Sequence, residues 1–343
     1  MLVDLSFLSL ASLIAIFVGT ALVIVIAGTR LAKAADRIAD LTGIGEALAG
    51  AVFLGASTSL PGIVLSGLSA GFGHADLAIG NAIGGIAAQT AFLAIADIAY
   101  RRANLEHAAA SLTNLTQGSL LIVLLAIPLI GMSAAPFTIL GVSPFSLILI
   151  GAYLFGLQLS SRVQADPMWE PEETAETRHD VPDTDEEAPE NARWVWLDLG
   201  FSALIAGSAG VVLAEAAVEI SAKTGLSETA VGTFMTAVTT SLPELVTSIA
   251  AVRQGALTLA VGGIIGGNAF DVLFLAVADI AYRDGSLYAA MTGDHVLIIA
   301  LTIAMTAVLL LGLLTRETYG IWRIGFESAS ILALYASAFL FLI

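Results

Sequence analysis

The chain of 343 residues is 57% hydrophobic and only 12% charged, with a mean hydropathy of +0.91. Soluble domains carry about a quarter charged residues, so this composition excludes the soluble class and places the protein in a lipid bilayer. The absence of cysteine excludes disulfides and thiolate metal sites. A net charge of −16 excludes a nucleic-acid binder and favours adaptation to high salt.

Apolar stretches long enough to cross a bilayer recur along the chain and predict an all-α integral membrane protein with ten transmembrane helices. The second and seventh stretches run long and contain Pro61 and Pro243, so each is expected to be a broken or tilted helix. The expected spans are residues 7–28, 43–71, 77–99, 113–133, 136–160, 197–220, 226–252, 258–281, 293–313 and 320–343.

The basic residues predict the orientation of these spans. With the N-terminus outside, eleven of the 13 lysines and arginines fall on the inner side, and only Lys223 and Arg283 fall on the outer side. Inner loops of membrane proteins are enriched in basic residues. The sequence therefore predicts a multi-pass protein of the cell membrane with both termini outside.

Residues 163–195 join a first half, residues 1–162, to a second half, residues 196–343, and differ from both. Eleven acidic residues lie among prolines in this segment, with few apolar residues. Such a composition is typical of a solvated, disordered linker, here on the cytoplasmic side. A cation-sensing acidic loop is the alternative, but the ligand spacing of a calcium loop is absent.

Residues 58–101 recur as residues 240–283, with 23 identities in 44 positions at a constant offset of 182. Each half has five expected spans, an odd number, so the second copy enters the bilayer from the opposite side. The sequence therefore predicts two inverted five-helix repeats. This architecture is typical of transporters that work by alternating access, with the binding site between the repeats.

Polar residues lie near the middle of the two proline-containing spans, where hydrocarbon is expected. They are Thr58 and Ser59 in the first copy, and Thr240, Ser241 and Glu244 in the second. Hydroxyl and carboxylate oxygens are suitable ligands for hard cations such as sodium and calcium. An ionisable residue at the bilayer centre is costly, so Glu244 is the strongest candidate for a functional role.

The third and eighth expected spans carry a second polar set. Asp271 lies four residues after Gly267, and its repeat partner in the first copy is Gln89. We expect both in the site, although interhelical glutamine bonds also serve packing. Near the ends of these spans, Asp97 and Asp279 each precede an arginine by four residues, which favours local ion pairs.

Two segments carry a resemblance to a known family: Thr-Thr-Ser-Leu-Pro-Glu at residues 239–244, and the glycine-rich residues 262–271 that end in Asn268-Ala-Phe-Asp271. With ten spans in two inverted copies, the chain resembles the sodium/calcium exchangers of the calcium/cation antiporter superfamily over essentially its whole length. The resemblance implies a mid-membrane site on the second, third, seventh and eighth spans. Its ligand positions fall on Thr58, Ser59, Gln89, Thr240, Ser241, Glu244, Asn268 and Asp271.

The first copy departs from the family pattern. Gly62 stands where the family has a second essential acid, Gln89 replaces an asparagine, and Gly85 and Gly267 replace serines. Two acids balance one calcium ion or two monovalent ions, but they balance three sodium ions less well. Gly62 is therefore expected to weaken calcium binding, although water in the vacated space could restore part of the coordination shell.

The sequence thus predicts a secondary antiporter rather than an enzyme, exchanging sodium for calcium without a cofactor. Inorganic cations and the lipid bilayer are its expected partners, and the sequence leaves the oligomeric state open. One alternative is a proton- or sodium-coupled exchanger of monovalent cations, with Glu244 taking a proton. Another is a degenerate scaffold that transports nothing, against which the retained acids argue. An intramembrane hydrolase is disfavoured because no histidine or lysine base lies near the hydroxyls.

Overall fold

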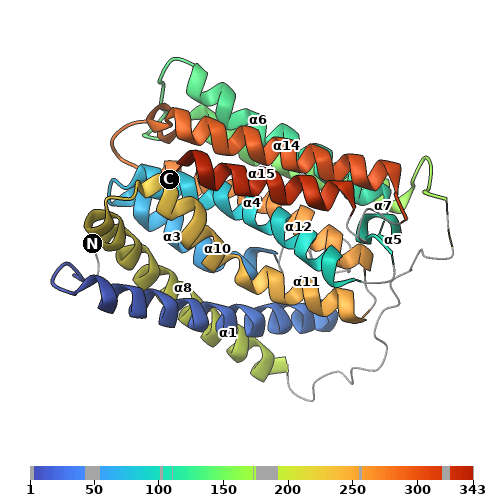
Figure 1. Cartoon of the computed structure of the whole chain (residues 1–343), viewed down its shortest axis with the longest axis horizontal. Helices are drawn as coiled ribbons and strands as arrows, with labels where there is room; N and C mark the ends of the chain where they lie inside the picture. Colours follow the sequence, from blue (N-terminus) through green and yellow to red (C-terminus); the bar gives the residue numbers. More distant parts are fainter. Residues whose placement is uncertain are drawn as a thin grey trace.

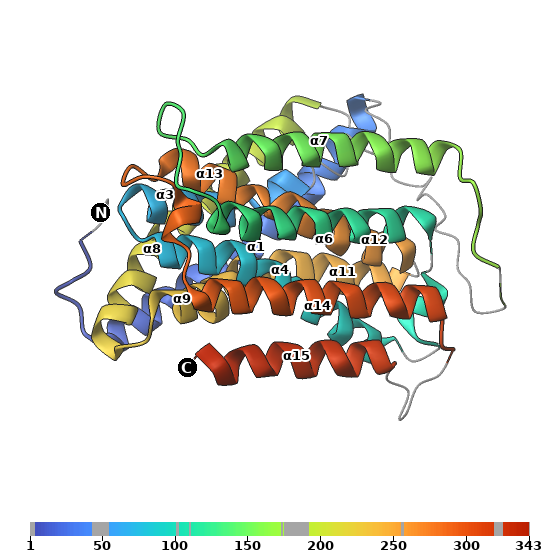
Figure 2. The same ribbon diagram turned by 90° about the horizontal axis from the view of Figure 1, so that it is seen from above.

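The computed structural model describes residues 4–42, 55–100, 103–109, 111–172, 174, 192–254, 257–318 and 325–342. Within these residues the chain is helical, and an isolated bridge between Ile139 and Val142 is its one β-type pairing. The long helices run side by side along a common direction, and both chain termini lie at the same end of the bundle (Figures 1 and 2).

The helices of the first half are α1 (Leu10–Thr42), α3 (Leu60–Gly71), α4 (Ala75–Ala99), α5 (Leu105–Ala108), α6 (Leu112–Ser133) and α7 (Pro144–Ala165). Those of the second half are α8 (Ala192–Thr224), α9 (Glu228–Ala230), the π-helix η1 (Val231–Thr236), α10 (Ala237–Thr240), α11 (Leu242–Gln254), α12 (Leu257–Asp271), α13 (Leu273–Ala281), the 3-10 helix η2 (Leu287–Ala290), α14 (Gly293–Thr315) and α15 (Phe326–Leu342). Helix α8 begins before residue 196, and residues 175–191 of the expected linker lie outside the described residues.

The offset of 182 residues reappears in the helix boundaries. Helix α8 begins and ends 182 residues after α1, and α15 begins 182 residues after α7. None of these helices lies inside the 44-residue match of the sequence. The constant offset therefore extends beyond the segment in which residue identities reveal it.

Seven of the described helices are long and apolar enough to cross a membrane, and an eighth is added if a bent pair counts as one span. The bent pair consists of Glu228–Thr240 and Leu242–Arg253, which meet at 44°. Two shorter apolar helices, α3 and α15, lie in the second and tenth expected spans. Residues 43–54 and 320–324, the preceding parts of those spans, lie outside the described residues.

The expected helix breaks are confirmed. In the second half the helix is interrupted at Ser241, and in the first half at Ser59, each two residues before a proline. Proline has no N–H to donate and its ring collides with the preceding turn, so a helix stops and restarts there. Both serines are thereby placed at helix ends inside the bundle.

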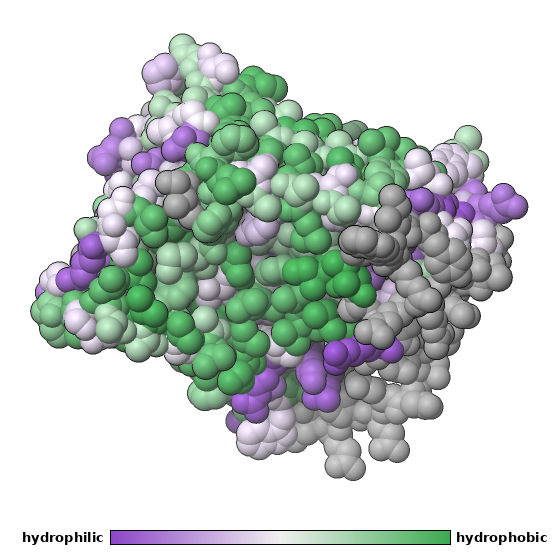
Figure 3. Space-filling view, in the orientation of Figure 1, coloured by the Kyte–Doolittle hydropathy of each residue, from purple (hydrophilic) through white to green (hydrophobic). Residues whose placement is uncertain are grey.

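Helix α4 forms the centre of the bundle. Its apolar segment is 94% buried, compared with 28% for α1 and for α7. It packs against α3, η1, α10, α11, α12, α14 and α15 (Figure 1). On the visible face of the molecule, apolar residues cover the middle and hydrophilic residues gather toward its ends, as a bilayer requires (Figure 3).

Helices α1 and α8 pack along each other beside this core (Figure 1). Helix α1 contacts the helix break of the second half at Gly28, and α8 contacts the helix break of the first half at Gly210. These two glycines are 182 residues apart and therefore occupy equivalent positions in the two halves. A Cβ atom on Gly28 would lie 2.5 Å from Cγ of Pro243, and one on Gly210 would lie 2.8 Å from the carbonyl oxygen of Pro61. Any larger side chain would push α1 or α8 away from the breaks.

Asp279, near the end of α13, caps a helix of the other half. Its Oδ2 accepts hydrogen bonds of 2.7 Å from the Ser143 amide and the Ser146 hydroxyl at the start of α7, and its Oδ1 accepts one from the Leu287 amide. A carboxylate at a helix N-terminus satisfies amides that lack intrahelical partners. The expected local ion pair between Asp279 and Arg283 is therefore wrong.

Asp97, the repeat partner of Asp279, makes the equivalent cap in the opposite direction. Its Oδ2 accepts a hydrogen bond of 2.8 Å from the Ser328 hydroxyl of α15, and its Oδ1 accepts one of 2.7 Å from the Leu105 amide. The Gly325 amide, just before α15, also donates to Asp97. The predicted partner Arg101 lies outside the described residues. Each half thus caps the last helix of the other half, and we call these two arrangements the crossed caps.

Candidate cation-binding site

Asp271 is the centre of a buried hydrogen-bond network between the two halves. Its Oδ1 accepts a hydrogen bond of 2.5 Å from the Ser59 hydroxyl, and its Oδ2 accepts one of 2.6 Å from the Gln89 amide. The same Gln89 amide donates to the Ser241 hydroxyl at 3.3 Å. All four side chains are buried. Four of the residues selected from the sequence therefore meet, although they lie on four different helical segments.

Glu244 lies in the first turn of α11 and is also buried. Its carboxylate forms a hydrogen bond with the Thr58 side chain and interacts electrostatically with Asp271. The break at Ser241 leaves the start of α11 inside the bundle. The first backbone amides of a helix have no partner within the helix, so they favour a negative charge nearby. The two carboxylates predicted for the centre are therefore neighbours.

Thr240 and Asn268 are turned toward neighbouring residues rather than toward Asp271. The Thr240 hydroxyl donates weakly to Asn81 Oδ1 at 3.4 Å, and the Asn268 amide donates to the Thr90 hydroxyl at 3.0 Å. Asn81 also accepts a hydrogen bond of 3.0 Å from Thr236.

Sequence reasoning did not select Asn81. The feature of the sequence that could have indicated Asn81 is an amide side chain inside an apolar span. The structure shows this span to be the most buried of the described ones.

Three acceptor oxygens of the centre are buried and have no hydrogen-bond donor among the described residues: Gln89 Oε1, Glu244 Oε2 and Asn268 Oδ1. Leaving a buried acceptor unpaired costs about 1–3 kcal/mol, so such atoms are expected to have a ligand. A Cβ atom on Gly267 would lie 3.5 Å from Gln89 Oε1 without a clash, so this glycine leaves room beside the oxygen. The free atoms are carboxylate and amide oxygens, which hard cations prefer.

Within the part of the chain that the structure describes, two acids, Glu244 and Asp271, lie at this centre. Among the described residues, no group of three or more histidine, cysteine, aspartate or glutamate side chains is placed to hold a metal ion. A cation here would therefore be shared between Glu244, Asp271 and neutral oxygens. Weak, irregular coordination of this kind suits an ion that must be released again.

The space beside Gly62 is filled by an aromatic ring. A Cβ atom on Gly62 would lie 2.7 Å from Cε2 of Phe274. The edge of the Phe274 ring therefore lies in the space beside Gly62 that was considered for water.

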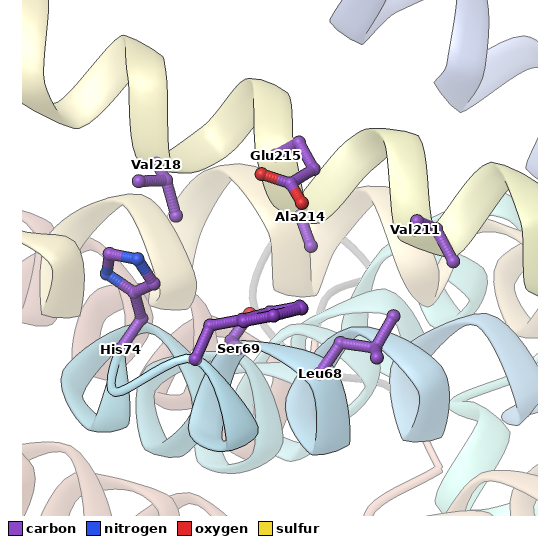
Figure 4. Close-up of a pocket in the computed structure, with 8 residues that line it drawn as sticks. Leu68, Ser69, His74, Val211, Ala214, Glu215 and Val218 are labelled. Carbon is purple, nitrogen blue, oxygen red and sulfur yellow. The ribbon is translucent and has the colours of Figure 1, made fainter. Parts of the chain in front are cut away.

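A separate groove lies between α3 and α8, away from this centre. Leu68, Ser69, Phe72 and His74 line one side, and Val211, Ala214, Glu215 and Val218 line the other (Figure 4). Figure 4 shows His74 and Glu215 on facing elements of this groove. Glu215, in α8, lies at this groove.

His74, at the start of α4, gives a test of pH-dependent stability. Its Nδ1 lies 2.7 Å from Oε1 of Glu228, and this hydrogen bond raises the His74 pKa above its usual 6.5, while partial burial opposes the rise. A raised pKa stabilises the folded state fully below pH 6.5, and the contribution disappears as the pH rises through the folded-state pKa. We expect His74→Gln to lower the unfolding temperature at pH 6 and to have little effect at pH 9.

The measurement is thermal unfolding of purified protein in detergent at both pH values. Glu228→Gln is the matched control, because it removes the same pair from the other side and should give the same pH profile. An equal effect of His74→Gln at pH 6 and pH 9 would contradict the assignment.

The apolar helices and the buried polar centre are those of a multi-pass membrane protein. The sequence profile of the family described as sodium/calcium exchanger protein matches residues 12–161 and 193–343. The chain therefore belongs to the sodium/calcium exchanger protein family, whose members are transporters and not enzymes.

Relatives agree with this assignment. The chain is 30% identical to the putative antiporter CaxA of Alkalimonas amylolytica over 295 residues, which cover 84% of this chain and 88% of the relative. It is 42% identical to the sodium/calcium exchanger MaX1 of Methanosarcina acetivorans over 59 residues, 17% of each chain.

Solved structures share the fold at low sequence identity. The sodium-calcium exchanger NCX_Mj superposes with a TM-score of 0.61 at 18% identity, covering 98% of this chain and 100% of that one. The H+/Ca2+ exchanger CAX superposes with a TM-score of 0.66 at 15% identity, covering 96% of this chain and 82% of that one.

Proposed function

We propose that this protein is a secondary antiporter that exchanges calcium for a monovalent cation across the cell membrane. The observation that carries the proposal is the buried centre between the halves, with two neighbouring carboxylates and three acceptor oxygens that lack donors. Similar proteins that are named as calcium exchangers support calcium as one of the exchanged ions. They include both a sodium/calcium exchanger and an H+/Ca2+ exchanger, so sodium and protons are both candidates for the second ion.

The proposed site contains all eight residues selected from the sequence. Glu244 and Asp271 supply the negative charge. Ser59 and Gln89 donate to Asp271 and hold it in place until a cation arrives, and Ser241 accepts a hydrogen bond from Gln89. Thr58, Thr240 and Asn268 offer further oxygens, the last two after small side-chain rotations. No resident cofactor is needed for this activity, because calcium and the monovalent cation are themselves the substrates.

The proposed topology is ten spans in two inverted five-helix repeats, with both termini outside. Both termini lie at the same end of the bundle, which is consistent with an even number of spans (Figures 1 and 2). The constant offset of helix boundaries and the crossed caps support two related halves. In such a design, exchange of conformations between the halves moves the site from one side of the membrane to the other.

Calcium uptake into proteoliposomes tests the proposal. Vesicles loaded with sodium are diluted into sodium-free buffer containing radioactive calcium, and a second set carries an outward proton gradient in place of sodium. We expect calcium uptake that depends on one of the two gradients, and a calcium ionophore should release the accumulated calcium. The gradient that drives uptake identifies the coupling ion. Folded protein that accumulates calcium under neither gradient would contradict calcium exchange and favour exchange of monovalent cations.

A further inference from the structure

Position 62 is the repeat partner of Glu244, yet it carries no side chain. A Cβ atom on Gly62 would lie 2.7 Å from Cε2 and 3.3 Å from Cζ of Phe274. Phe274 is only 3% exposed, so its ring lies fully inside the bundle at this point. The ring therefore occupies the place where a carboxylate equivalent to Glu244 would begin.

Packing holds the Phe274 ring in this place. It meets Phe270 edge-on with ring centroids 6.4 Å apart, and Phe270 meets Tyr153 edge-on at 6.0 Å. Edge-to-face pairs at such distances are favourable beyond the burial of their area. A rotation of Phe274 away from Gly62 would disturb this row of three aromatic rings, in an interior that is packed without spare volume.

The other polar groups on this side of the centre are uncharged. The Asn81 amide donates to the carbonyl of Gly62 at 3.3 Å. Gln89 stands at the repeat partner of Asp271 and is also a neutral amide. Among the described residues of the centre, negative charge is therefore confined to the second half, at Glu244 and Asp271.

We infer that Phe274 limits the charge that this site can carry, so that one calcium ion exchanges for two monovalent cations and no net charge crosses the membrane. The inference rests on the calcium exchange proposed above. Uncompensated charge is strongly disfavoured in a buried site. Two carboxylates are neutralised by one calcium ion, by two sodium ions or by two protons. A third monovalent cation would have no carboxylate, because the ring takes its place.

The membrane potential tests this inference directly. Full-length protein is reconstituted into liposomes, and valinomycin with set potassium gradients holds the potential at 0 or −100 mV. The measured quantity is the steady-state ratio of internal to external calcium under a fixed coupling gradient. If one net charge moved per cycle, 100 mV would change this ratio about 50-fold. For the wild-type protein we expect the same ratio at both potentials.

The possible outcomes separate the two proposals. Coupled uptake with a ratio that changes with potential overturns the electroneutral exchange but leaves calcium exchange standing. The absence of coupled uptake at both potentials overturns both. Coupled uptake that is insensitive to potential supports both.

Variants test the role of Phe274 itself. The double variant Gly62→Glu/Phe274→Ala places a third carboxylate where the ring was, and we expect its calcium ratio to become dependent on potential. Phe274→Ala alone is the matched control, because it opens the space but keeps two carboxylates. A folded, active double variant whose ratio is still insensitive to potential would contradict the role of Phe274. If the double variant does not fold, the wild-type measurement decides the stoichiometry alone.

Discussion

Replacing Glu244 with glutamine should reduce coupled calcium uptake by about 100-fold or more, because calcium affinity depends steeply on the number of charged ligands. Glutamine keeps the shape of the side chain but removes one of the two charges at the centre. The remaining carboxylate, Asp271, can balance only half of the charge of a calcium ion. The measurement is the initial rate of gradient-driven uptake into proteoliposomes at equal protein content.

The same variant should remain folded, since neutralising a buried charge often leaves stability unchanged or raises it. The unfolding temperature in detergent checks this. Glu170→Gln is the matched control, because Glu170 is exposed and follows the end of α7, far from the centre in sequence. Undiminished uptake by Glu244→Gln would remove this residue from the site.

Replacing Asp279 with alanine should lower the free energy of unfolding by roughly 3–5 kcal/mol, because three hydrogen-bond donors lose a charged acceptor at once. Two of these donors, the amides of Ser143 and Leu287, are backbone groups that start other segments. The loss should therefore loosen the start of α7, whose other main contacts are with α6 and α13. Denaturant or thermal unfolding of the purified protein in detergent measures the effect.

Asp284→Ala is the control for this change, because Asp284 is an exposed aspartate a few residues away. Exposed substitutions of this kind usually change stability by no more than about 0.5 kcal/mol. Asp97→Ala removes the equivalent cap and should cause a loss of similar size. Equal stability of the Asp279→Ala and Asp284→Ala variants would contradict the structural role of the crossed caps.

Much of the fold and the composition of the buried polar centre could be predicted from the sequence. Long apolar stretches reveal membrane helices, and the prolines at 61 and 243 reveal where two of them break. A carboxylate in hydrocarbon is so costly that Glu244 and Asp271 stand out without a structure. The repeat then pairs each of them with a position in the other half, and the structure places Gln89 in contact with Asp271.

Contacts between distant segments could not be predicted in this way. The i, i+4 spacing of Asp279 and Arg283 indicated a local pair, yet Asp279 binds residues more than 130 positions away. Phe274 reads as an ordinary core residue, and only the structure places its ring against Gly62. Asn81 has no repeat partner of the same type, so the comparison of the two copies gave no signal for it.

The crossed caps also bear on how such a protein could have arisen. Each aspartate binds the start of a helix that belongs to the other half, so each half alone lacks one carboxylate that its last helix uses. An ancestor with a single copy of the repeat would have needed a second subunit to supply the missing carboxylate. Gene duplication and fusion would then have preserved an existing dimer contact inside one polypeptide, with the acidic linker as the join.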